Sequence, residues 1–185
     1  MAVGLFGGAF DPPHAGHVAL AQAAKERFEL DPLIVLVSEQ PGHKDVDLPA
    51  DVRLELARAA FPDDDVRLDP FPRTVDMLRA EQFDDPTFLV GADQFVDFLT
   101  WKEPETVLEL TRLGVATRPG FDRGLLDTVL RSVGRPERVL FFDIEPNPAA
   151  SRDIRLLAAE GLPLEGLVPA AVERLIHEHR LYGPD

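Results

Sequence analysis

Cysteine is missing from the 185-residue sequence, which excludes disulfide bonds, thiolate nucleophiles and zinc bound through sulfur. Long hydrophobic runs are missing too, since no stretch approaches the roughly 18 apolar residues that a membrane-spanning helix needs. The N-terminus has no basic flank, and glycines interrupt its short apolar run, which argues against a signal peptide. We therefore expect a cytoplasmic protein that does not associate with membranes.

Positive charge is scarce in this chain. It has only three lysines, Lys25, Lys44 and Lys102, and its formal net charge is −14. An overall negative field repels a phosphate backbone, so we expect no binding to DNA or RNA. Chemistry on phosphates must then depend on a local group of hydrogen-bonding or positive side chains. Three of the five histidines lie in the first quarter of the sequence, which indicates where such a site would be.

Short aliphatic runs alternate with longer helical patterns, and the length suits one domain over residues 1–185. The expected strands are Val3–Phe6, Leu33–Val37, Val66–Leu68, Phe88–Val90, Leu113–Ala116 and Val139–Phe142. The expected helices are His17–Phe28, Ala50–Phe61, Val75–Phe83, Glu103–Leu110, Gly124–Ser132 and Asp153–Glu160, with a closing helix that begins near Pro169. Alternating strands and helices predict an α/β fold: a doubly wound, mostly parallel sheet with helices on both faces.

Two common nucleotide-binding fingerprints are also missing, since neither G-x-G-x-x-G nor G-x-x-x-x-G-K-[ST] occurs. The first predicted strand instead lies in the stretch VGLFGGAFDPPHAGHVALA, residues 3–21. Ligands of parallel sheets bind beyond the carboxyl ends of the strands, which is where this stretch continues. Gly7 and Gly8 permit close backbone approach and positive φ, and the next helix presents unpaired N–H groups to an anion.

Two histidines of this stretch, His14 and His17, are three residues apart, and Gly16 lies between them. One histidine in the loop and one at the helix start can both aim at a single phosphate chain. No third metal ligand is evident nearby, so the spacing favours phosphates over a metal ion. The alternative is an ordinary tight turn in which both histidines cap the helix or lie on the surface.

The segment GGAFDPPHAGH (Gly7–His17) resembles the signature G-G-x-F-D-P-x-H-x-G-H of the nucleotidyltransferase superfamily, and within it that of bacterial nicotinate-nucleotide adenylyltransferases. Three later segments are similar to parts of the same family: VGADQFVDFLTWKEPETVLEL (Val90–Leu110), ATRPGF (Ala116–Phe121) and LVPAAVERLIHEHRLY (Leu167–Tyr182). The resemblance implies a Rossmann-like fold. It also implies transfer of AMP from ATP, with Mg²⁺, to the 5′-phosphate of nicotinate mononucleotide, giving deamido-NAD and pyrophosphate.

The resemblance further implies which residues form the site. The catalytic residues would be His14, His17, Lys44 and Arg155. The ATP-binding residues would be Gly7, Gly8, Phe10, Gly16, His17, Gly91, Asp93, Ser151, Arg152 and Arg155. The acceptor-binding residues would be Thr74, Trp101, Lys102 and Arg118. No residue is assigned to the metal, because Mg²⁺ can arrive held by ATP and water.

The segment AASRDIRLLAAEG (Ala149–Gly161) offers a second group of phosphate ligands. If Ser151 is the N-cap of a helix, its hydroxyl, the first N–H groups and the guanidinium groups of Arg152 and Arg155 can meet one phosphate. The segment is partly similar to the family motif I-S-S-T-x-I-R, with Ala150 in place of a serine. The alternative is an ordinary capped surface helix.

Several predicted site residues have plain alternatives. Lys44, in a segment similar to the family's P-P-H-K, would bring a positive charge to the phosphates or lie on the surface. Asp93 would accept hydrogen bonds from a ribose or cap a helix. Arg118 would approach the phosphates or merely close a turn.

The acceptor residues lie where the chain departs most from the family pattern. Trp101, the only tryptophan, would stack on the pyridine ring or belong to the core. Thr74 is similar to a threonine that reads the nicotinate carboxylate, but Arg73 and Met77 replace a tyrosine and a second threonine around it. Two other functions therefore stay open. One is a sister nucleotidyltransferase that uses nicotinamide mononucleotide, phosphopantetheine or an alcohol phosphate, and the other is a nucleotide-binding regulatory protein. The sequence also leaves a homo-oligomer open.

Overall fold

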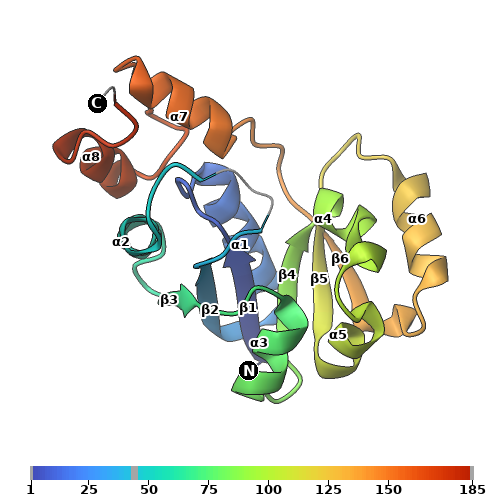
Figure 1. Ribbon diagram of the computed structural model, residues 1–185. Coiled ribbons are helices and arrows are strands. Elements are labelled where there is room, and N and C mark those ends of the chain that lie inside the picture. Colours follow the sequence, from blue (N-terminus) through green and yellow to red (C-terminus); the bar gives the residue numbers. More distant parts are fainter. Residues whose placement is uncertain (1, 43–45, 184–185) are drawn as a thin grey trace.

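A computed structural model describes residues 2–42 and 46–183, which include a six-stranded sheet (Figure 1). The strand order is β3-β2-β1-β4-β5-β6, and every neighbouring pair is parallel. The strands are β1 (Ala2–Gly8), β2 (Leu30–Ser38), β3 (Asp65–Asp69), β4 (Thr87–Gly91), β5 (Arg112–Thr117) and β6 (Val139–Asp143). This is the order of a doubly wound, Rossmann-like sheet, so the predicted fold class is confirmed.

The described residues also form eight α-helices and two short 3₁₀-helices. The α-helices are α1 (Ala15–Phe28), α2 (Ala50–Ala60), α3 (Thr74–Glu81), α4 (Ala92–Val96), α5 (Pro104–Leu110), α6 (Arg123–Ser132), α7 (Ser151–Ala159) and α8 (Ala170–Glu178). The 3₁₀-helices are η1 (Phe98–Thr100) and η2 (Pro136–Arg138). No helix among the described residues is long and apolar enough to cross a membrane.

The predicted strands all lie inside observed strands, because unbroken aliphatic runs are what a parallel sheet with two covered faces needs. Three predicted helix ends need correction: α1 begins at Ala15 and not at His17, α7 begins at Ser151 and not at Asp153, and α3 ends at Glu81 and not at Phe83. Helix α4 was not predicted. A helix of five residues is shorter than two turns, so it shows no helical period in the sequence.

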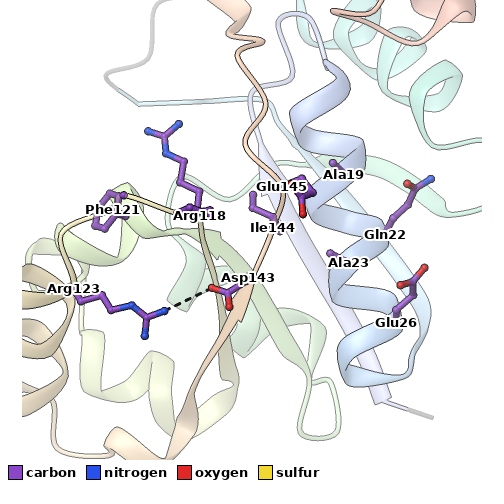
Figure 2. A pocket seen from close by; sticks show the side chains of 12 residues that line it. Ala19, Gln22, Ala23, Glu26, Arg118, Phe121, Arg123, Asp143, Ile144 and Glu145 are labelled. Atoms are coloured by element: carbon purple, nitrogen blue, oxygen red, sulfur yellow. Dashed lines mark ion pairs between the residues drawn. The ribbon is translucent and has the colours of Figure 1, made fainter.

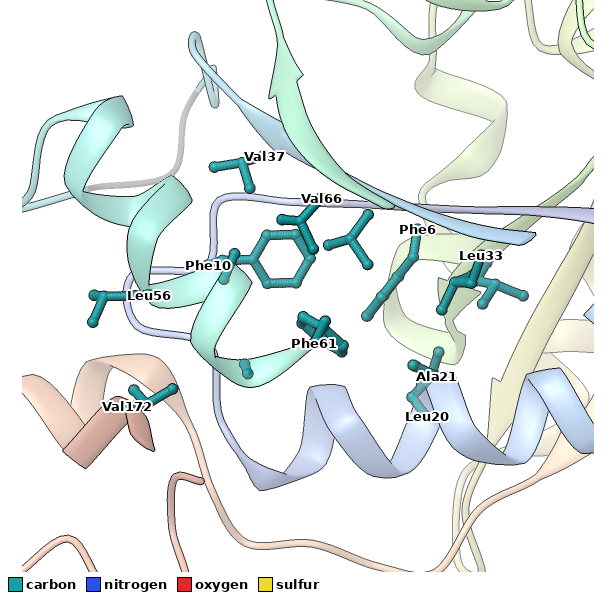
Figure 3. Packing of buried hydrophobic residues seen from close by; sticks show 14 of the residues in the cluster. Phe6, Phe10, Leu20, Ala21, Leu33, Val37, Leu56, Phe61, Val66 and Val172 are labelled. Carbon is teal, nitrogen blue, oxygen red and sulfur yellow. The ribbon is translucent and has the colours of Figure 1, made fainter. Parts of the chain in front are cut away.

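Successive residues of each strand pack into different halves of the core, as the two-residue period of a strand requires. In β2, Val35 and Val37 join the half that contains α1, α2, α7 and α8, whereas Ile34 and Leu36 join the half that contains α3 to α6. Figure 3 shows part of the first half, where Phe10 lies between α2 and the sheet. Helices therefore cover both faces, as predicted.

Candidate active site

The segment that connects β1 to α1, residues 9–14, lies at the point where the strand order reverses, because β1 pairs with β2 on one side and with β4 on the other. We call this segment the histidine loop. Crevices at such switch points, beyond the carboxyl ends of the strands, are where doubly wound sheets bind ligands. The N-terminal turn of α1 follows the loop and carries no acidic side chain, so no carboxylate there opposes an anion near the positive end of the helix dipole.

The structure brings the two histidines of the motif together. Their ring centroids are 3.7 Å apart, with 31° between the ring planes. The backbone N–H of His14, which is the N-cap of α1, donates to Nδ1 of His17 at 3.2 Å. A neutral imidazole has one donor and one acceptor nitrogen, so this bond makes Nε2 the nitrogen of His17 that carries the hydrogen.

His14 is kept neutral by its surroundings. Burial lowers the pKa of His14 from 6.5 to about 4. Its Nδ1 is buried and has no hydrogen-bond partner among the described residues. A buried polar nitrogen without a partner costs free energy. His14 is therefore neutral at neutral pH.

The burial of His14 predicts that acid destabilises the protein through this one group. Between pH 6.5 and about 4 the unfolded chain protonates His14 and the folded chain does not, so the free energy of unfolding falls as the pH falls through this window. We expect the wild type to lose about 2 kcal/mol more than His14→Asn between pH 7 and pH 5, since about 1.5 pH units lie between 6.5 and 5 and each corresponds to about 1.4 kcal/mol. Urea unfolding of both proteins at the two pH values measures this. Equal losses would contradict the assignment.

Packing requires the glycines of the motif, but the expectation of positive φ at Gly7 and Gly8 is wrong. A Cβ on Gly8 would lie 2.9 Å from ring atoms of Phe10, and one on Gly16 would lie 3.1 Å from the ring of His14. The loop residue with positive φ is Phe10, at 51°. Phe10 is 2% exposed and its ring meets the ring of His17 edge-on at 5.1 Å, so the side chain belongs to the core and does not line a surface that a nucleotide could contact.

Two side chains of α7 donate hydrogen bonds to backbone carbonyls of the histidine loop. The hydroxyl of Ser151 donates to the carbonyl of Pro12 at 2.9 Å, and Nη1 of Arg155 donates to the carbonyl of Asp11 at 2.9 Å. The sequence predicted Ser151 as the N-cap of this helix, and this prediction is wrong. Ala150 is the N-cap, and Ser151 is the first helical residue. Arg152 is exposed.

Three of the four predicted acceptor residues line one cavity of about 540 Å³, whose wall also includes Gly7 and Gly8. Thr74 is the first residue of α3, and Trp101 is half-buried, with its ring edge-on to Phe98 at 5.4 Å. Lys102 pairs with Asp76 at 2.8 Å. Met77 is 1% exposed in the core and does not line the cavity. We call this cavity the acceptor cavity. It adjoins the end of β1, because Gly7 and Gly8 are part of its wall.

The fourth predicted acceptor residue, Arg118, lies elsewhere. It lines a second cavity, of about 590 Å³, formed by α1 and by the segments that follow β5 and β6. Figure 2 shows α1 on one side of this cavity and Arg118, with Asp143, on the other. The structure thus does not bring Arg118 together with Thr74, Trp101 and Lys102, because β5 ends beside α1 and not beside α3.

The remaining predicted residues have simpler positions. Gly91 ends β4 and is the N-cap of α4, so Asp93 is an exposed second residue of that helix and not its cap. Lys44 lies outside the described residues. Among those residues, no group of three or more histidine, cysteine, aspartate or glutamate side chains could hold a metal ion.

Sequence reasoning did not identify the buried polar residues around the loop. Arg53 of α2 is 1% exposed, and its Nη1 donates to the carbonyl of Ala9 at 2.6 Å. Tyr182 donates to the carboxylate of Asp11 at 2.7 Å. No local pattern marks either residue, since arginine on an amphipathic helix and tyrosine near a chain end are usually surface residues. The one available signal was that Tyr182 is the only tyrosine.

A family model described as Cytidylyltransferase-like matches residues 5–156 of this chain. The match includes the histidine loop, the acceptor cavity and the start of α7. With the doubly wound sheet and the paired histidines at its switch point, it defines the chain as a nucleotidyltransferase.

Relatives over the full length narrow this class. A protein from Symbiobacterium thermophilum named "Probable nicotinate-nucleotide adenylyltransferase" is 38% identical and covers 97% of this chain and 94% of its own. One with the same name from Thermus thermophilus is 37% identical and covers 98% and 100%. The solved Plasmodium falciparum nicotinic acid mononucleotide adenylyltransferase complexed with NaAD shares the fold, with a TM-score of 0.76 at 14% identity over 98% and 97% of the two chains. This chain belongs to the bacterial nicotinate-nucleotide adenylyltransferase family.

Proposed function

We propose that this protein transfers AMP from ATP to the 5′-phosphate of nicotinate mononucleotide and releases pyrophosphate and deamido-NAD. The observation that carries the proposal is the histidine pair at the start of α1, on the loop whose first residue, Ala9, lines the acceptor cavity. The names of the full-length relatives support the same reaction.

The reaction needs positioning and charge stabilisation more than a reactive protein group. The acceptor phosphate attacks the α-phosphate in line, so no covalent enzyme intermediate forms. Negative charge moves to the leaving pyrophosphate. In our proposal the Nε2–H of His17 donates to that charge, and the positive end of the α1 helix dipole adds to the stabilisation. Arg155 and Lys44 would add positive charge nearby.

The acceptor cavity supplies the groups that a pyridine nucleotide needs. Trp101 offers an aromatic face or edge to the ring, the hydroxyl of Thr74 offers a hydrogen bond to its carboxylate, and Lys102 adds positive charge. Arg118 is left out of this site, since it lines the other cavity. On the ATP side we propose that Gly91 and Asp93 approach the ribose.

We further propose that Mg²⁺ enters with ATP. The described residues contain no carboxylate group suited to hold the ion by themselves, so the donors that fit it are the phosphate oxygens and water. When bound, the ion neutralises charge on the β- and γ-phosphates.

Pyrophosphate release tests the proposal. The purified protein is given ATP and Mg²⁺ with nicotinate mononucleotide, its amide or phosphopantetheine, and we expect release with the nicotinate compound to be the fastest. Faster turnover of the amide would overturn the acceptor assignment but not the adenylyl transfer. Release with none of the three would favour a nucleotide-binding regulatory protein.

A variant of Trp101 tests, in the same assay, whether the acceptor binds in the acceptor cavity. Trp101→Ala should raise KM for nicotinate mononucleotide about tenfold, since loss of a stacked ring costs about 1 to 1.5 kcal/mol, and should leave KM for ATP unchanged. Leu99→Ala is the matched control, because Leu99 is an exposed apolar residue in η1 that does not line the cavity. Equal changes in both KM values would show that Trp101 has a structural role and does not bind the acceptor.

A further inference from the structure

We propose that Tyr182 is a positioning residue for adenylyl transfer, because its hydroxyl, through Asp11, sets the shape of the histidine loop. Tyr182 lies 171 residues after Asp11 in the sequence, on the turn that follows α8. The kinetic part of this inference rests on the proposed function.

The carboxylate of Asp11 is held at both oxygens. Asp11 is 2% exposed; its Oδ1 accepts from the Tyr182 hydroxyl at 2.7 Å, and its Oδ2 accepts from the backbone N–H of Asp47 at 2.5 Å. A carboxylate fixed at two oxygens by different segments cannot rotate without losing one of the bonds. Hydrogen bonds to a charged acceptor are also among the strong ones.

The carbonyls of the loop are held in the same way. Arg53 donates to Ala9, Arg155 donates to Asp11, and Ser151 donates to Pro12. These donors come from α2 and α7, so side chains from other elements determine the path of the loop. Tyr182 adds the contact from the chain's C-terminal turn.

The hydroxyl of Tyr182 is a permanent donor in this arrangement. Burial, and then the charge of Asp11, raise the pKa of Tyr182 above its ordinary value, so the hydroxyl keeps its hydrogen at any working pH. Tyr182 also has φ of 65°, in the left-handed region, which costs a residue other than glycine about 1 kcal/mol. The contacts of its side chain hold the turn in this conformation.

Two prolines connect Asp11 to the first of the two histidines. Pro12 and Pro13 stand between Asp11 and His14, and the proline ring fixes φ. A displacement of Asp11 should therefore also displace His14, because few backbone angles between them are free to compensate. The backbone N–H of His14 in turn holds Nδ1 of His17. Tyr182 acts through this series of contacts and does not itself touch the substrate.

The variant Tyr182→Phe removes the hydroxyl and keeps the ring. We expect kcat to fall about tenfold, KM for both substrates to change less than twofold, and the fold to be retained. Ser132→Ala is the matched control, since it also removes one hydroxyl that donates a hydrogen bond, here to the carbonyl of Thr128 at 2.9 Å, but at an exposed residue of α6. The control should leave kcat unchanged.

NMR titration of the histidine rings gives a readout that does not depend on turnover. In Tyr182→Phe the pKa of His14 should rise from about 4 toward 6.5, because a displaced loop exposes the ring. If the wild type turns over none of the acceptors, the proposed function fails, while this titration still tests the positioning. A lower free energy of unfolding with unchanged kcat and an unchanged His14 titration would overturn the inference.

Asp11→Asn provides a second test if Tyr182→Phe does not fold. An asparagine side chain has one acceptor oxygen where aspartate has two, so it cannot accept from the Tyr182 hydroxyl and from the N–H of Asp47 at separate oxygens. We expect it to lower kcat by about the same factor as Tyr182→Phe. Where both single variants fold, the double variant should be no slower than the slower single one, since both changes break the same contact. Effects that multiply in the double variant would overturn the inference.

Discussion

Replacement of His17 by alanine is expected to lower kcat about a hundredfold or more. The hydrogen bond from the N–H of His14 fixes Nδ1 of His17 as an acceptor, so its Nε2–H is a preorganised donor. Loss of one such donor from a site where charge develops costs about 10²- to 10³-fold in kcat. Steady-state kinetics with ATP and nicotinate mononucleotide measure the effect.

Two further variants make this result specific. His177→Ala removes a histidine from the surface of α8, where it faces Glu173, and should leave kcat unchanged. His17→Gln retains an acceptor for the N–H of His14, so it preserves the start of α1 but not the imidazole donor. We expect it to fold normally and to be slow. A change confined to KM for ATP would mean that His17 only binds ATP and does not stabilise the transition state.

Replacement of Arg53 by methionine is expected to lower the free energy of unfolding by about 3 kcal/mol, because a buried charge that loses its partner is strongly destabilising. Burial lowers the pKa of Arg53, and the charge of Asp11 opposes that shift. Its guanidinium also donates to the carbonyls of Leu48 and Ala9 at 3.0 and 2.6 Å. Methionine fills similar space but leaves both carbonyls without this donor and the Asp11 carboxylate without this nearby positive charge.

The same substitution on the same helix provides the control. Arg58 is exposed, and its Nε lies 3.4 Å from the carbonyl of Val66, so Arg58→Met should change the free energy of unfolding by less than about 0.5 kcal/mol. Urea unfolding of the wild type and both variants gives the comparison. Equal effects of the two substitutions would show that Arg53 contributes no more than a surface arginine.

The fold was predictable because its pattern is local. Runs such as Leu33–Val37 can be buried on both faces only in a covered parallel sheet, and their alternation with helical segments leaves few topologies. The histidine motif was predictable for the same reason: His14, His17 and Gly16 lie within four residues, and the helix that follows sets their geometry. Thr74, Trp101 and Lys102 were brought to one cavity as expected.

The errors come from contacts between distant segments. The position of Ser151 suggested a helix cap, but its hydroxyl is used by the carbonyl of Pro12, 139 residues away. Arg118 was assigned to the acceptor, yet the place of β5 in the sheet puts it beside α1. Neither position can be predicted from the neighbouring sequence, since each depends on how distant segments are arranged around the sheet.

The sequence by itself determined the class of chemistry and the type of fold, because both depend on residues within one turn or one strand of each other. The tertiary structure alone decided what holds the histidine loop in place. Asp11, Arg53 and Tyr182 come from three remote segments. Asp11 and Arg53 are buried and Tyr182 is partly buried, so the polar group of each must find a partner. Those partners are supplied only when the sheet, α2 and the C-terminal turn have come together.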